Sequence, residues 1–242
     1  MRDHEFYPVT QIQMEILSAM LKEPESTTYN IPFYFKLSSA IDADRLAGAI
    51  KKAFSVHPYA LVTFFADDAG NWRVKRNDDS KPEIQIVEAD AFPDTASLIK
   101  PFPIDGERFY RISIYKTKDG IYLWLDFCHI LFDAFSALAF IDDISRAYSG
   151  EEPLPEEKTF FDIALEEESL RKTERFMDDR RYYDKLLEDP GNVSVPLGDI
   201  KKDGMVSRTY ESDAMLHPAE VKKFCLDNKD RKSTRLNSSH DQ

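Results

Sequence analysis

The chain has 242 residues, 42% of them hydrophobic and 12% aromatic, which indicates a folded globular protein rather than a disordered one. Its formal net charge of −12 disfavours nucleic acid or an anionic membrane as the main partner. Two cysteines indicate neither a disulfide framework nor a thiolate metal site, and no apolar run is long enough for a membrane span. With no signal-peptide pattern at the start, we expect a cytoplasmic protein.

The first half of the chain alternates between helix and strand patterns. Thr10 and Gln13 have the spacing of a capping box, which predicts an amphipathic helix over 11–22. Asp42 is placed to cap a second helix over 43–57. Alternating apolar and polar residues predict strands at 31–38, 60–66, 72–75, 83–87, 109–116 and 121–128. A Gly-containing turn joins the last two strands as a hairpin.

The second half is mainly helical. A helix over 135–150 should end at Gly150, a typical C-cap residue. One long charged helix is expected over 159–189, stopped by Pro190 and Gly191. Its candidate buried residues are Phe161, Leu165, Phe176, Tyr183 and Leu187. A strand at 205–212 and a helix at 217–228 follow. The interleaved pattern predicts an α/β or α+β protein.

The last residues, 230–242, differ in character from the rest. They are polar and aperiodic, which is typical of a disordered tail. A second interpretation fits the residues better, because the in-frame translation of a common sequencing-library adapter reproduces residues 230–240. We therefore expect 230–242 to be read-through of library DNA, not native sequence, and exclude it from fold reasoning.

The strand at 121–128 leads to the main candidate for chemistry. Alternation puts Ile121 and Phe127 on one face, which His129 would continue, and Cys128 on the other face. His129 would thus emerge from an apolar surface just before a helix, a common position for reactive side chains. Apolar surroundings favour the neutral imidazole, which can accept a proton. The alternative is a core histidine hydrogen-bonded to a backbone carbonyl.

Other chemistries find less support in the residues. A Cys–His nucleophilic pair is disfavoured because Cys128 and His129 are adjacent on a strand and point apart. Cys128, His129 and Asp133 match no metal-ligand spacing. The chain has no nucleophile elbow, phosphate loop or dinucleotide fingerprint. His57, before Pro58 at a helix end, is more typical of a capping or packing residue than of a catalyst.

Residues 128–136, "CHILFDAFS", resemble the H-H-x-x-x-D-G motif of the condensation domains of non-ribosomal peptide synthetases. These domains are part of the chloramphenicol-acetyltransferase-like superfamily. Further segments are similar to other blocks of the family and occur in the family's order. They are residues 7–17, 27–65, 99–117 and 160–168.

The resemblance implies a chloramphenicol-acetyltransferase-like lobe, in which a mixed sheet packs with helices. The family fold has two such lobes with the catalytic histidine in the cleft between them, and the second lobe would be truncated here. Residues 1–190 would form the first lobe. Residues 191–229 would form a linker with the opening strand and helix of the second.

Residue by residue, the resemblance assigns His129 as the catalytic histidine, which positions or deprotonates an acceptor amine. Asp133 matches the motif aspartate and would brace the loop through an ion pair. Cys128 replaces the first histidine and Ala134 replaces the glycine, at an expected cost in backbone freedom and room. Leu61 stands where the family often has an arginine, so Asp133 lacks its usual local partner.

The implied function is amide-bond formation between a carrier-bound acyl or peptidyl thioester and an aminoacyl acceptor, in secondary-metabolite biosynthesis. Donor and acceptor peptidyl carrier domains would be the partners, and their phosphopantetheine arms the tethers, with no cofactor or metal bound directly. An adenylation domain is expected downstream. The start at Met1 implies a donor from another polypeptide or a fatty acyl group. This chain alone should be inactive.

Two alternatives remain open on the sequence. One is a stand-alone acyltransferase of the same superfamily that uses acyl-CoA. The other is a non-catalytic domain that docks carrier proteins without reacting.

Overall fold

The computed structural model describes residues 6–77, 79–106, 108–188 and 218–227. The chain divides into two units, residues 1–189 and 190–242. In the second unit the described residues form one helix, α7 (Pro218–Asp227), which confirms the helix expected at 217–228. The strand expected at 205–212, the stop at Pro190 and the segment 230–242 lie outside the described residues.

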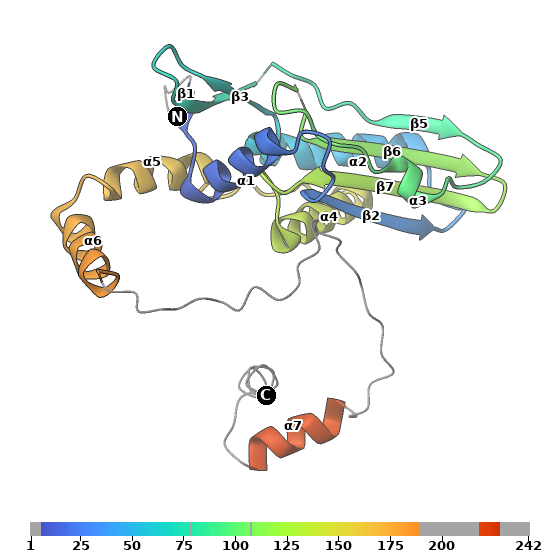
Figure 1. Ribbon diagram of the computed structural model, residues 1–242. Helices are drawn as coiled ribbons and strands as arrows, with labels where there is room; N and C mark the ends of the chain where they lie inside the picture. Colours follow the sequence, from blue (N-terminus) through green and yellow to red (C-terminus); the bar gives the residue numbers. More distant parts are fainter. Residues whose placement is uncertain (1–5, 78, 107, 189–217, 228–242) are drawn as a thin grey trace. The chain divides into compact units, whose positions relative to one another are not determined.

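The first unit is built on two sheets (Figure 1). The larger has the order β2-β7-β6-β5, where β5 is parallel to β6 and the other pairs are antiparallel, so the predicted mixed sheet is confirmed. Its strands are β2 (Asn30–Leu37), β5 (Gln85–Glu88), β6 (Tyr110–Thr117) and β7 (Gly120–Cys128). The smaller, antiparallel sheet has the order β1-β4-β3. Its strands are β1 (Phe6–Pro8), β3 (Val62–Ala66) and β4 (Trp72–Arg76).

The helices of this unit follow the predicted pattern except for α3 and for the break between α5 and α6. They are α1 (Gln11–Lys22), α2 (Ala43–Val56), α3 (Thr95–Leu98), α4 (Ala134–Ser149), α5 (Phe160–Leu170) and α6 (Glu174–Leu186), with a short 3₁₀ turn at Pro58–Ala60. The predicted bounds of α1 are confirmed, and both bonds of its capping box are present. Gly150 ends α4 in the left-handed region at φ 95°, as a C-cap glycine does.

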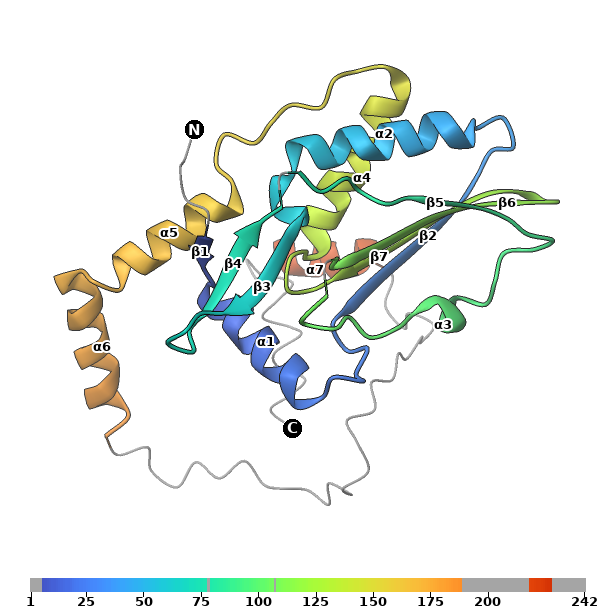
Figure 2. The same cartoon turned by 90° about the horizontal axis from the view of Figure 1, so that it is seen from above.

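One hydrophobic core lies between the larger sheet and the helices α2 and α4, which run side by side (Figures 1 and 2). The face of β7 that carries Leu125 and Phe127 points into it, as the alternation predicted. Aromatic rings fill its centre, with 4.9 Å between the ring centroids of Phe54 and Phe140. Burying a large apolar side chain of this kind contributes about 1.5–3 kcal/mol.

A second core joins α1, the smaller sheet and α5. Tyr7 of β1 packs on Phe161 of α5, with 4.4 Å between ring centroids. Cys128, the last residue of β7, points into this second core, whereas Phe127 points into the first. The turn that follows β7 therefore begins where the two cores meet, and this places the candidate site.

The single helix expected over 159–189 is wrong. The chain breaks after α5, and Thr173 caps a new helix, accepting a hydrogen bond from the Phe176 N–H at 3.3 Å. Phe161 is buried as predicted, but Tyr183 and Leu187 are 59% and 65% exposed. Helical spacing alone placed those side chains on an apolar face, and none of the residues of α6 is buried.

Smaller differences have local causes. The strand expected from residue 60 begins at Val62, because the preceding residues turn in a 3₁₀ conformation after Pro58, which has no N–H to donate. β1 and α3 were not predicted, since segments of three and four residues show no periodicity. Within the described residues, no helix is long and apolar enough to cross a membrane.

Candidate active site

His129 is the first residue after β7, and backbone hydrogen bonds fix its place. Its N–H donates to the Tyr29 carbonyl at 2.8 Å, which ties the turn to the residue before β2. The N–H groups of Leu131 and Phe132 both donate to the Cys128 carbonyl, at 3.0 and 3.2 Å. The chain therefore folds back on the end of β7, with the His129 side chain exposed.

A pocket of about 510 Å³ contains His129, a volume in the usual range for small-molecule sites. The pocket is formed by α1, the turn after β7, the start of α4, the segment before α5, and α5 itself. Its apolar lining includes Ile12, Ile16, Ile130, Phe132, Phe160 and Ile163. Its ionisable lining is His129, Asp133, Glu156, Lys158 and Glu167. An exposed base in a largely apolar pocket can take a proton from a bound nucleophile.

Gln13 has a second role at this site that sequence reasoning missed. Its Oε1 accepts from the Thr10 N–H at 3.2 Å, as the capping box predicts. Its Nε2, buried with the rest of the side chain, donates to the Ile130 carbonyl at 3.2 Å. The glutamine thus joins the start of α1 to the turn that carries His129. The capping-box spacing was a signal for Gln13, but it points only to the helix.

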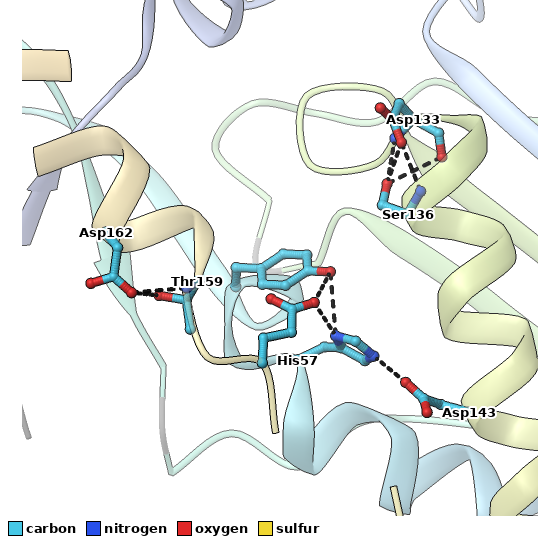
Figure 3. A network of polar contacts seen from close by, with 8 residues as sticks. His57, Asp133, Ser136, Asp143, Thr159 and Asp162 are labelled. Carbon is cyan, nitrogen blue, oxygen red and sulfur yellow. Dashed lines mark hydrogen bonds and ion pairs between the residues drawn. The ribbon is translucent and has the colours of Figure 1, made fainter. Parts of the chain in front are cut away.

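The ion pair expected for Asp133 is absent among the described residues. Asp133 instead caps α4, with its Oδ1 accepting from the Ser136 N–H at 2.7 Å and from the Ser136 Oγ at 2.8 Å (Figure 3). These bonds, the backbone one first, hold the pKa of the Asp133 carboxyl below its usual value. The structure therefore shows Asp133 as the N-cap of α4, in place of the expected ion pair.

The two departures from the family motif have little consequence for the backbone. Cys128 is fully buried in the second core, 3.8 Å from the Met20 sulfur, and burial raises the pKa of its thiol to about 12. A thiol in that state is no nucleophile, in agreement with the sequence interpretation. Ala134 is exposed and forms the first residue of α4, where alanine is a favourable helix former. The expected cost in room next to the site stays a prediction.

The structure separates the two histidines that the sequence singled out. His129 is exposed, so the alternative of a core histidine is wrong, and its ring makes no hydrogen bond with a described residue. The buried histidine is His57, which follows the last residue of α2, as the capping or packing interpretation predicted. Its two ring nitrogens face the carboxylates of Asp143 and Glu156, at 2.8 and 3.0 Å. Figure 3 shows the His57–Asp143 contact.

A buried ion pair on β6 and β7 was also missed. Asp126 is fully buried, and its Oδ2 accepts from Arg111 at 3.0 Å and from Asn30 at 2.9 Å. Desolvation by burial raises the pKa of the Asp126 carboxyl. Arg111 also donates to the carbonyls of Lys100 and Pro101, so the pair anchors the segment before β6. Alternation assigns Asp126 to the less apolar face of β7. The pattern therefore provides no reason to expect that this side chain is buried.

Other sites are less suited to chemistry. Among the described residues, no group of three or more His, Cys, Asp or Glu side chains is placed to hold a metal ion. A larger groove of about 740 Å³ lies between α1, the smaller sheet and residues 101–105. Its lining includes Met20, Phe64 and Trp72 but no histidine or cysteine, so it offers no general base of the kind that His129 provides.

Comparison with known proteins supports the resemblance in sequence and in fold. The model of the family described as "Condensation domain" matches residues 3–235. Surfactin synthase subunit 1 of Bacillus subtilis (strain 168) is 25% identical over 221 residues, and tyrocidine synthase 3 of Brevibacillus parabrevis is 26% identical over 183 residues. The matches cover 90% and 74% of this chain but 6% and 3% of those synthases.

Solved structures agree with the fold. The starter condensation domain of rhizomide synthetase superimposes with a TM-score of 0.66 at 14% identity, covering 78% of this chain and 49% of that one. The first condensation domain of the CDA synthetase gives a TM-score of 0.60 at 17% identity, with 78% and 51% covered. The chain therefore spans about half the length of these domains. The family match also extends into residues 230–235, the start of the expected read-through, which stays a prediction.

Proposed function

Because this chain belongs to the condensation-domain family, we propose that it forms the first lobe of an enzyme that joins a carrier-bound acyl or peptidyl thioester to an aminoacyl acceptor. Residues 1–190 are assigned to that lobe, and 191–229 to the start of the second. The observation that carries the proposal is the exposed His129 side chain in its pocket, immediately after β7.

In the proposed reaction, the acceptor amine attacks the thioester carbonyl carbon. A C–N bond forms, the C–S bond breaks, and the proton lost by the amine ends on the departing thiol. His129 positions the amine or takes its proton on the way. The apolar walls keep water away from the thioester, which favours the amine over hydrolysis.

The partners proposed are donor and acceptor peptidyl carrier domains, whose phosphopantetheine arms bring both substrates to the pocket. No cofactor bound by this chain itself is needed for the step. An adenylation domain that loads the acceptor is proposed further along the same synthetase. The curated relatives are named as synthases, and the chain matches a small part of each, which supports membership of a larger assembly.

Single-turnover condensation tests this proposal, in a polypeptide that contains the complete domain and with loaded donor and acceptor carrier proteins. His129→Ala should lower the rate by about 10²–10⁴-fold, the usual contribution of a general base. Lys118→Ala is the control, because Lys118 is 80% exposed in the β6–β7 turn, outside the pocket. Equal rates for wild type and His129→Ala would remove His129 from the mechanism and leave carrier docking without reaction as the better account.

A further inference from the structure

His57 connects two elements through a buried ring. Its Nε2 lies 2.8 Å from an Asp143 oxygen on α4, and its Nδ1 lies 3.0 Å from a Glu156 oxygen in the segment between α4 and α5 (Figure 3). The side chain of His57 is 4% exposed, against 16% for Asp143 and 34% for Glu156. The contact between His57 and Asp143 is therefore largely removed from water. Salt and solvent screen a buried contact of this kind less than an exposed one.

Few donors face these two carboxylates. An ionised carboxylate can only accept hydrogen bonds, so an N–H or O–H group must face each one. The His57 ring faces both carboxylates, and the Tyr59 hydroxyl also donates to Glu156. Among the described residues, no lysine or arginine forms an ion pair with Asp143 or Glu156.

Three polar side chains of the described residues contact the ring. Asp143 comes from α4, Glu156 from the connecting segment, and Tyr59 from the 3₁₀ turn after α2. The Tyr59 hydroxyl lies 3.3 Å from His57 Nδ1 and donates to Glu156 at 3.4 Å. The apolar ring of Phe140 also lies beside His57, with 5.5 Å between the ring centroids.

This network reaches the pocket that contains His129. Glu156 and Tyr59 both line that pocket, as does Lys158 two residues further along the segment. A second charged contact, the exposed pair of Lys52 and Glu152, also joins α2 to this segment. Exposed pairs of that kind contribute little, typically about fivefold or less in the unfolding equilibrium constant. The buried ring is thus the stronger polar link between the segment and the helices.

We propose that His57 is a positioning residue. By holding Asp143 and Glu156 at once, it fixes the connecting segment against α2 and α4, and so fixes one wall of the pocket. The importance of that wall for catalysis rests on the proposed function, whereas its placement does not. The tests below therefore need no substrate, and either proposal can fail while the other stands.

A double-mutant cycle on the 242-residue chain measures the link. Replacing His57 by Gln and Glu156 by Ala, singly and together, should reveal a coupling of about 10- to 100-fold in the unfolding equilibrium constant, as for a charge-assisted hydrogen bond. The matched cycle on Lys52 and Glu152 should give about fivefold or less. Equal couplings in the two cycles would overturn the proposal. If His57→Gln fails to fold, the unfolding equilibrium constants of Glu156→Gln and Glu156→Ala are compared instead, because both variants keep the His57 ring.

A second readout separates positioning from general stability. Tryptic cleavage after Lys158 should be about tenfold faster in His57→Gln or Glu156→Ala than in wild type, because the segment opens locally. It should be unchanged in Lys52→Ala. Unchanged cleavage in the His57 and Glu156 variants would contradict the proposal.

Discussion

Asp133 shows how a motif residue acts through local structure. Its carboxylate satisfies the Ser136 N–H, one of the N–H groups that the first turn of α4 would leave without a partner. Asp133→Ala should lower the free energy of unfolding by about 1 kcal/mol, the usual value for an N-cap. Asp133→Asn should lower it by only about a few tenths of a kcal/mol, because an amide oxygen also accepts a hydrogen bond from the Ser136 N–H. Urea unfolding at low protein concentration measures both.

The same residue predicts a pH dependence. The folded-state pKa of Asp133 lies below its ordinary value of 3.8, so its stabilisation is present above that value and is lost as pH falls through the lower folded pKa. The stability difference between wild type and Asp133→Ala should therefore narrow below about pH 4. A difference that persists unchanged well below that pH would contradict the capping role.

Single residues also show which parts of the candidate site can be predicted from the sequence. His129 and Asp133 were found by resemblance, and alternation placed Cys128 on the face opposite Phe127, as the two cores confirm. The helix cap of Asp133 was readable in principle, since Asp133 and Ser136 have the spacing of a cap. The partners of His57 were not, because Asp143 and Glu156 lie 86 and 99 residues away and no local pattern joins them.

At the scale of elements, one ion pair crosses from β6 to β7. Arg111 and Asp126 are directly opposite in the register, and one oxygen of Asp126 has no hydrogen-bond partner among the described residues. Arg111→Leu should lower the free energy of unfolding by about 3 kcal/mol, because it leaves a buried carboxylate without its cation. The control is Arg108→Leu, whose partner Glu83 is exposed, with an expected loss of about 1 kcal/mol or less.

The contribution of the Asp126 carboxyl to the free energy of unfolding should change with pH in the opposite direction to that of Asp133, and Arg111→Leu should reveal it. The folded-state pKa of Asp126 is raised by burial, so ionisation destabilises the fold as pH rises above about 4. Without Arg111 that penalty grows, and the loss should be larger at neutral pH than at pH 4. Unfolding curves at the two pH values measure it, and an equal loss at both would argue against a buried charge.

Long periodic elements were predicted well, and short or interrupted ones were not. α1, α2, β6 and β7 carry their own caps, turn or alternation, so local rules suffice. The break between α5 and α6 was missed because the apolar spacing continues across it, although Thr173 is a good cap. Whether an apolar face is covered depends on distant parts of the chain, and that information is absent from a helical pattern.

At the scale of the whole molecule, several large apolar side chains are exposed, which is typical of surfaces that pack against another part of a protein. Phe135 and Leu138 at the start of α4 are 84% and 54% exposed, and Leu186 at the end of α6 is 59% exposed. The chain also spans about half of the solved condensation domains that it matches. We therefore expect the isolated chain to self-associate with rising concentration and to lack condensation activity.

Sedimentation velocity over a range of concentrations tests that expectation, with binding of a hydrophobic dye as a second measurement. Phe135→Ser with Leu138→Ser should reduce self-association. The control, Lys118→Ser, changes an exposed charged residue and should not. A monomer with a cooperative unfolding transition for residues 1–229 would show that the exposed groups are tolerated.

The pairing of β2 with β7 has a consequence for the order of folding during synthesis. β2 pairs with β7 and with no other described strand, and Asn30 and Asp126, which meet at the end of that ladder, are 96 residues apart. The ribosome therefore releases β2 long before β7 exists. β6 and β7 can form their hairpin as soon as both have emerged, because their contacts are local. The pairing of β2 with β7 closes a long loop and comes afterwards. Until then Phe33 and Phe35 of β2 lack the core against which they pack in the folded chain.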